Sequence, residues 1–126
     1  MKPLVSIITP VYNGERTIDK TIESVINQTY DKFEMIIVDD LSNDKTADIV
    51  KKYQKKDNRI KLFILDKKGG ASGARNFAIK KATGKYVAFL DGDDLWKKDK
   101  LEKQVKFMED NNIYFSYTDY CYIDND

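Results

Sequence analysis

The sequence predicts an α/β domain in which a mostly parallel, Rossmann-like sheet lies between two layers of helices. Short continuous runs of apolar residues, typical of strands buried on both faces, alternate with longer segments whose apolar residues recur at helical spacing. This alternation predicts right-handed strand–helix–strand crossovers and therefore parallel strands. Because 126 residues suit one domain, we expect residues 1–126 to form a single unit.

Each element is expected from its own pattern of apolar residues. Runs rich in β-branched and aromatic residues predict strands at residues 4–9, 33–38, 60–65, 86–90 and 114–120. Apolar residues spaced three or four apart predict helices across residues 18–26, 47–53, 74–82 and 101–108. For the last helix, Asp99 is the expected N-cap, and Glu102 would complete a capping box.

The charge balance and the missing residue types restrict the chemistry. A net charge of +1 gives no global field for nucleic acid, so no nucleic-acid partner is expected. The absence of histidine excludes Ser-His-Asp triads, histidine bases and most zinc sites, and the single Cys121 allows no disulfide within the chain. Any chemistry must therefore use carboxylates. The N-terminus leads directly into an apolar run and leaves no room for a signal peptide, so we expect a cytoplasmic protein.

Ligands of open α/β sheets bind beyond the carboxyl ends of the strands, so the loops after the strands are the places to inspect. After the first expected strand, Pro10 ends the ladder and Tyr12 is a candidate for stacking on a nucleobase. The alternative, that Tyr12 only packs against the next helix, stays open. After the second strand, we assign Asp40 to a ligand, whereas Asn43 and its neighbours suit the N-cap of the next helix.

The loop after the third strand is rich in small residues. Glycines at positions 69, 70 and 73 permit close approach of a phosphate, and Lys68 and Arg75 would supply positive charge. The spacing of the glycines is neither the dinucleotide-binding fingerprint nor a Walker loop. A flexible connector is therefore an open alternative.

The loop after the fourth strand carries Asp91, Gly92, Asp93 and Asp94. Three carboxylates at the end of a buried strand repel one another unless a cation neutralises them, and oxygen ligands select Mg²⁺ or Mn²⁺. Gly92 would let the backbone fold closely enough for Asp91 and Asp93 to flank one ligand. A plain polar turn is the alternative, but a turn needs fewer acidic residues.

Four motifs, each at the end of a different expected strand, together resemble the inverting family-two glycosyltransferases of GT-A fold. They are residues 5–13, Asp39-Asp40, Ala74-Arg75-Asn76 and residues 89–94. The resemblance implies a nucleoside-diphosphate sugar donor, most often UDP-linked. It places Pro10, Tyr12 and Asp40 at the nucleoside, Asp91 at the ribose or sugar, and Lys68 and Arg75 near the phosphates or sugar. Asp93 would bind the Mn²⁺ or Mg²⁺ that bridges the diphosphate, with Asp94 assisting.

The resemblance also implies that an acceptor hydroxyl attacks the sugar with inversion while a carboxylate general base removes its proton. None of the acidic residues near Asp126 matches the motif of that base, so we expect the base and the acceptor-binding part beyond Asp126. Residues 1–126 would then bind the donor without efficient transfer. The implied acceptor is a saccharide or a lipid-linked molecule, in surface polysaccharide or glycolipid synthesis, with the full-length protein a candidate for peripheral association with the inner face of the membrane.

Two other functions stay open. A magnesium-dependent phosphohydrolase of the haloacid dehalogenase type also places an Asp-x-Asp motif at a strand end, although after its first strand rather than its fourth. A non-catalytic nucleotide-binding or assembly module could keep the same fold. The glycosyltransferase interpretation requires Asp91 and Asp93 to lie together and Asp40 to lie near them.

Overall fold

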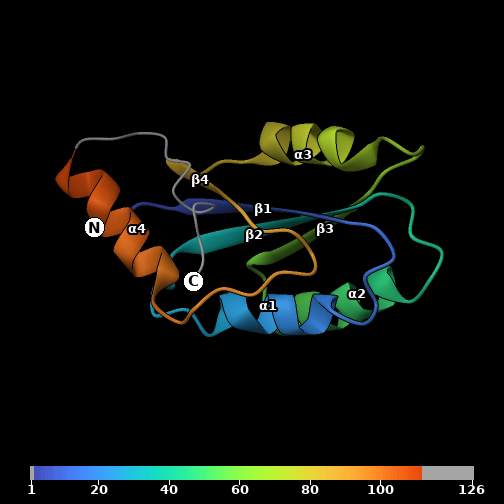
Figure 1. The fold of residues 1–126 in the computed structure, drawn as a ribbon, viewed down its shortest axis with the longest axis horizontal. Coiled ribbons are helices and arrows are strands. Elements are labelled where there is room, and N and C mark those ends of the chain that lie inside the picture. Colours follow the sequence, from blue (N-terminus) through green and yellow to red (C-terminus); the bar gives the residue numbers. More distant parts are fainter. Residues whose placement is uncertain (1, 112–126) are drawn as a thin grey trace.

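The computed structural model describes residues 2–111 as a parallel sheet with helices on both faces (Figure 1). The strands are β1 (Val5–Val11), β2 (Phe33–Asp39), β3 (Ile60–Ile64) and β4 (Tyr86–Phe89), in the spatial order β3-β2-β1-β4. The helices are α1 (Ile18–Ile26), α2 (Thr46–Lys56), α3 (Gly70–Lys81) and α4 (Lys100–Asp110). The predicted α/β class, the parallel pairing and the three layers are confirmed.

The sheet is buried on both faces, as its continuous apolar runs predict. The larger core cluster lies on the face covered by α1 and α2 and includes α4 residues; its sheet members include Ile7, Met35 and Ile37. On the other face, Ile8, Ile36 and Val38 pack against the small residues Ala74 and Ala78 of α3. Small side chains on α3 let this helix lie close to the sheet.

The described strands begin and end within two residues of the predicted positions. The predicted effect of Pro10 on β1 is the exception. The prediction that this proline ends the ladder is wrong, because β1 continues to Val11 and Pro10 pairs in register with Val38. The carbonyl of Pro10 accepts the Gly92 N–H on the β4 side, where the pairing with β4 stops at Phe89. Pro10 has no N–H to donate on that side, but because the paired part of β4 has already ended there, no hydrogen bond of the β1–β4 ladder is lost.

Two predicted helix starts are built differently. Asp99 occupies the N-cap position of α4, but its side chain makes no capping hydrogen bond and pairs instead with Lys103 at 3.0 Å. Glu102 accepts a hydrogen bond from the Thr29 hydroxyl at 2.5 Å, so the capping box is wrong. At α2, residues 42–44 were expected to suit the N-cap, but the N-cap position is Lys45; of the three, Asp44 accepts the Thr46 N–H, at 2.9 Å.

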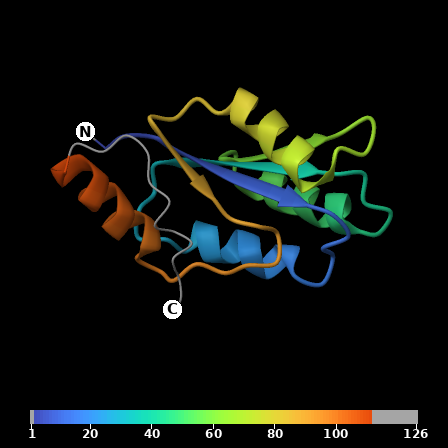
Figure 2. The ribbon, with the colours of Figure 1, turned by 45° about the horizontal axis from the view of Figure 1, so that its top comes forward.

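The segment between β4 and α4 runs along α1 (Figure 2). Gln28, just after α1, donates to the Lys97 carbonyl at 2.6 Å and accepts the Leu101 N–H at 2.9 Å. The fifth expected strand at residues 114–120 and Cys121 lie outside the described residues. Within residues 2–111, no helix is long and apolar enough to cross a membrane.

Candidate active site at the carboxyl edge of the sheet

The loops after β1, β2 and β4 and the start of α3 enclose one pocket of about 520 Å³. Most of the residues singled out in the sequence line it, namely Pro10, Tyr12, Asp40, Arg75, Asp91, Gly92 and Asp93. Lys68 and Asp94 are not among the lining residues, although Lys68 contacts Tyr12 and Asp94 belongs to the acidic group described next. The structure thus brings together residues that the sequence separates by as many as 83 positions, from Pro10 to Asp93.

Asp91, Asp93 and Asp94 form an acidic cluster. Each can offer a carboxylate oxygen such that the three oxygens lie within 4.8 Å of one another. Burial, and then the charges of Asp93 and Asp91, raise the pKa of Asp94 above its ordinary value. Carboxylate oxygens grouped in this way suit a hard divalent cation such as Mg²⁺ or Mn²⁺, which leaves other ligand positions to water and phosphate. The donor set therefore fits the expected metal.

The turn that carries the cluster is held by β1 and α1. Gly92 donates its N–H to the Pro10 carbonyl at 3.2 Å. Its carbonyl lies 2.9 Å from the Thr17 hydroxyl and 3.1 Å from the Thr21 hydroxyl. Thr21 also lies 2.8 Å from the Asp94 carbonyl and is fully buried. The sequence prediction missed these two threonines, although for Thr21 its place between the apolar residues Ile18 and Ile22 of α1 was a usable signal.

Arg75 lies beside the acidic cluster. Its guanidinium Nη2 is 3.5 Å from an Asp91 carboxylate oxygen, and both side chains are partly exposed. An ion pair of this length between partly exposed groups is weak, so the guanidinium can turn toward a more strongly charged partner at small cost. Arg75 therefore stands where a cationic group can meet both the acidic turn and a bound anion.

Asp40 and Lys68 meet beside Tyr12. Asp40 is 4% exposed, and its carboxylate accepts the N–H groups of Gly69 at 2.8 Å and Gly70 at 3.0 Å. Lys68 Nζ lies 3.6 Å from the same carboxylate and 3.0 Å from the centroid of the Tyr12 ring. Tyr12 exposes 48% of its surface, so its ring is accessible from the pocket and is not buried against α1.

The loops after β1 and β2 are tied to each other. Asn13, with a φ of 50°, donates its N–H to the Ser42 hydroxyl at 2.8 Å and accepts the Asn43 N–H at 3.0 Å. Ser42 in turn donates its N–H to Asp39 at 3.0 Å. Asn13, Ser42 and Asp39 were not singled out for this role in the sequence. Their contacts fix the wall of the pocket that holds Tyr12.

A parallel sheet flanked by helices, with an acidic turn beside a pocket at its carboxyl edge, is the architecture of GT-A glycosyltransferases. The chain belongs to glycosyl transferase family 2, since the family model of that description matches residues 6–125.

Two curated relatives illustrate the family. The chain is 52% identical over 125 residues to the putative teichuronic acid biosynthesis glycosyltransferase TuaG of Bacillus subtilis (strain 168), covering 99% of this chain and 50% of the relative. It is 48% identical over 122 residues to the Escherichia coli UDP-Glc:alpha-D-GlcNAc-diphosphoundecaprenol beta-1,3-glucosyltransferase WfgD, covering 97% of this chain and 47% of that protein. The chain thus spans about half the length of these relatives.

Solved structures of glycosyltransferases share the fold. S. aureus TarS 1-349 in complex with UDP superposes with a TM-score of 0.80 at 38% identity, over 89% of this chain and 33% of that one. The mannosyltransferase PcManGT from Pyrobaculum calidifontis, in complex with GDP-Man and Mn²⁺, also gives a TM-score of 0.80, at 30% identity, over 86% of this chain and 33% of that one.

Proposed function

We propose that this chain binds a nucleoside-diphosphate sugar, with UDP as the nucleotide, together with Mn²⁺ or Mg²⁺. The complete protein would transfer the sugar to an acceptor hydroxyl with inversion. The observation that carries the proposal is that the acidic cluster opens onto the same pocket as Tyr12 and Arg75. A site for a divalent cation, an aromatic face and a cationic side chain are what a nucleoside diphosphate requires.

The nucleoside end of the pocket is proposed to lie at Tyr12, Pro10 and Asp40. Tyr12 offers a half-exposed ring on which a base can stack. Lys68 covers part of that ring, so a base would have to displace its ammonium group or stack beside it. The released ammonium group would then be free to approach the phosphates, which is the role that the family resemblance implies for it.

The diphosphate end is proposed to lie at the acidic cluster. Asp93 and Asp91 would hold the cation, with Asp94 assisting, and Gly92 keeps the turn close to β1. When bound, the cation supplies Lewis-acid stabilisation of the negative charge that develops on the departing diphosphate. Arg75, weakly paired with Asp91, would bind phosphate or sugar oxygens and add to that stabilisation.

The acceptor side is proposed from the relatives. Their names refer to teichuronic acid biosynthesis and to a diphosphoundecaprenol-linked acceptor, which supports a saccharide or lipid-linked acceptor in surface polysaccharide or glycolipid synthesis. The proposed general base lies beyond Asp126, so residues 1–126 alone would bind the donor and transfer sugar weakly or not at all. Peripheral membrane association of the complete protein, on the cytoplasmic side, belongs to the same proposal.

A thermal-shift experiment tests the proposal against the phosphohydrolase alternative. UDP-glucose and Mn²⁺ together should raise the melting temperature of the chain more than the sum of their separate effects, because each would stabilise the binding of the other. The same chain should not hydrolyse p-nitrophenyl phosphate in Mg²⁺. Hydrolysis of this ester without any joint effect of nucleotide and metal would favour the phosphohydrolase.

A further inference from the structure

One side of α1 carries four polar side chains, which we call the polar stripe. They are Thr17 at the N-cap position, Thr21 and Ser24 within the helix, and Gln28 just after it. The intervals of four, three and four residues place them along one side of α1. Thr21 and Gln28 are buried, and a buried polar group costs free energy unless it is hydrogen-bonded. The partners of the polar stripe therefore matter.

The polar stripe binds the backbone of the segment that leads from the acidic turn to α4 (Figure 2). Residues 92–99 form neither helix nor strand, so their backbone N–H and C=O groups need partners from elsewhere. Ser24 accepts the Trp96 N–H at 3.3 Å, and Gln28 donates to the Lys97 carbonyl at 2.6 Å. The two threonines do the same for the turn itself. One helix thus holds this segment through side-chain-to-backbone contacts.

Thr21 holds the backbone before and after Asp93. Its hydroxyl lies 3.1 Å from the Gly92 carbonyl oxygen and 2.8 Å from the Asp94 carbonyl oxygen. The Thr17 hydroxyl is a second donor to Gly92, at 2.9 Å. Because the carbonyl groups on either side of Asp93 are both held by α1, the direction in which its side chain leaves the backbone depends on this helix.

These contacts leave the carboxylates available to a ligand. The polar stripe binds main-chain atoms of the turn, whereas the side chains of Asp93 and Asp94 are exposed and belong to the acidic cluster. The like charges of the cluster repel one another, which works against this arrangement when no cation is bound. Hydrogen bonds that hold the turn before binding reduce the ordering cost of binding, and so raise the affinity.

We propose that Thr17 and Thr21 are positioning residues for the metal site, because their hydroxyls hold the backbone of residues 92–94 so that the acidic cluster is arranged before the cation binds. The proposal rests on the proposed function and adds to it two residues that act through the backbone of the turn. The rival explanation is that both threonines only stabilise the fold. A purely structural role lowers stability but leaves the Mn²⁺ affinity of the folded chain unchanged, whereas a positioning role lowers the affinity as well.

Three threonine variants separate these roles. Thr21→Val keeps the shape of the side chain and removes its hydroxyl, and Thr21→Ser keeps the hydroxyl. Thr17→Val removes the second donor to Gly92. The Thr17 side chain makes no capping hydrogen bond to α1, so this change removes no cap. All variants are measured in the 126-residue chain.

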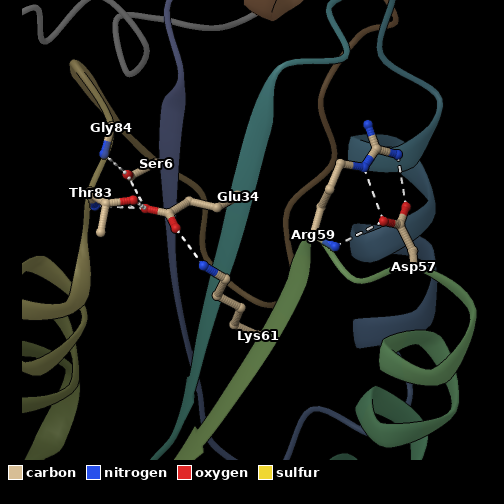
Figure 3. Close-up of polar contacts among 7 residues, drawn as sticks. All are labelled: Ser6, Glu34, Asp57, Arg59, Lys61, Thr83 and Gly84. Atoms are coloured by element: carbon tan, nitrogen blue, oxygen red, sulfur yellow. Dashed lines mark hydrogen bonds and ion pairs between the residues drawn. The ribbon is translucent and has the colours of Figure 1, made fainter.

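Ser6→Ala is the matched control, because it also removes a buried hydroxyl. Ser6 is fully buried near the start of β1, at the end of the strand opposite to the pocket (Figure 3). Its hydroxyl donates to Glu34 at 2.6 Å and accepts the Gly84 N–H at 2.8 Å. Loss of these bonds should lower the stability of the fold without touching the acidic turn.

The first measurement is Mn²⁺ titration followed by water-proton relaxation. The second, without metal, is hydrogen exchange of the Asp94 amide, which donates to the Asp91 carbonyl at 3.0 Å and closes the turn. We expect Thr21→Val to weaken Mn²⁺ binding about tenfold, the equivalent of one lost hydrogen bond, and to accelerate this exchange. Thr17→Val should weaken binding about threefold, since Thr21 still holds Gly92. Thr21→Ser and Ser6→Ala should keep the original Mn²⁺ affinity.

Several results would overturn the proposal. An unchanged Mn²⁺ affinity in Thr21→Val would show that its hydroxyl only stabilises the fold. Equal losses of affinity in Ser6→Ala and Thr21→Val would show that the affinity follows stability and not the position of the turn. A loss in Thr21→Ser as large as in Thr21→Val would exclude the hydroxyl as the cause. If Thr21→Val does not fold, Thr17→Val decides by the same criteria. Failure of the unaltered chain to bind Mn²⁺ would instead overturn the proposed metal site, and this proposal with it.

Discussion

Gly92 lies so close to Val11 that a β-carbon on the glycine would be 2.7 Å from Val11 Cγ2 and 2.9 Å from Val11 Cβ. Val11 is the last residue of β1, so the acidic turn rests directly on the end of a central strand. The turn cannot move away without losing the hydrogen bond from the Gly92 N–H to Pro10 and those from the Thr17 and Thr21 hydroxyls to the Gly92 carbonyl. Because position 92 carries no side chain, the turn can lie against Val11, and this contact fixes the position of the acidic cluster.

Replacing Gly92 with alanine should therefore damage both stability and metal binding. The added methyl group overpacks a site bounded by β1, so we expect a loss of about 1–3 kcal/mol in the free energy of unfolding. Mn²⁺ affinity should fall as well, because the carboxylates on either side of the glycine are displaced. Urea denaturation measures the first effect and Mn²⁺ titration the second. A Gly92→Ala chain with the original stability and Mn²⁺ affinity would contradict the account.

Unlike Gly92, Gly73 has room for a side chain. A β-carbon at Gly73 meets nothing within 4 Å, and the residue lies inside α3. Because glycine costs a helix interior about 0.5–1 kcal/mol relative to alanine, Gly73→Ala should raise the free energy of unfolding by that amount. Gly73 is not among the pocket-lining residues, so UDP affinity should not change. A large loss of UDP affinity in this variant would mean that the ligand approaches the backbone at Gly73.

Glu34 should make stability depend on pH. Burial raises the pKa of this carboxyl, but hydrogen bonds from Lys61, Ser6 and Thr83 outweigh burial and lower the pKa from 4.5 to about 2. A lowered pKa in the folded state means that the ionised group stabilises the fold above pH 4.5, and that this stabilisation is lost as the pH falls from 4.5 toward 2.

Comparison with Glu34→Gln measures that contribution. We expect the unaltered chain to exceed the variant by about 2 kcal/mol in the free energy of unfolding at neutral pH, with the difference shrinking below pH 4.5. Denaturation of both chains between pH 7 and pH 3 provides the test. A difference that stays constant across this range would show that the Glu34 carboxyl does not titrate as described.

Tyr12 should contribute to UDP binding through its aromatic ring and not through its hydroxyl group. Stacking of a base on an aromatic side chain is worth about 1–3 kcal/mol when tested by alanine substitution, so Tyr12→Ala should weaken UDP binding about tenfold or more. Tyr12→Phe keeps the ring and should bind UDP as the unaltered chain does. Calorimetric titration of both variants is the measurement. Equal affinities for the alanine and phenylalanine variants would exclude stacking at this ring.

The fold was predictable because its signals are local and repeated. Continuous apolar runs at β1 and β2 mark strands buried on both faces, and helical spacing across residues 18–26 marks α1. The capping box at Asp99 was wrong because Glu102 is held by Thr29, from a segment far away in sequence. Pro10 was misjudged for a similar reason: whether its missing N–H matters depends on where the neighbouring β4 ends.

The candidate site was predictable in composition but not in its internal contacts. The positions after the strands supplied the pocket residues, since parallel strands bring their carboxyl ends to one edge. The hydrogen bonds from Gly69 and Gly70 to Asp40 depend on the left-handed φ of Gly70, which residue types alone do not give. Thr21 was missed because its buried hydroxyl binds the backbone of a turn 71 residues later.

The most direct test of the central claim is calorimetric titration of UDP into the chain with and without Mn²⁺, before and after Asp93→Ala. Asp99→Ala is the matched control, because it removes a carboxylate that lies at the N-cap position of α4 and outside the acidic cluster. We expect Mn²⁺ to strengthen UDP binding by more than about tenfold in the unaltered chain and in Asp99→Ala, and to have no effect in Asp93→Ala. A UDP affinity that does not depend on Mn²⁺ would contradict a metal-bridged diphosphate at this edge of the sheet. So would an affinity that Mn²⁺ raises equally in the unaltered chain and in Asp93→Ala.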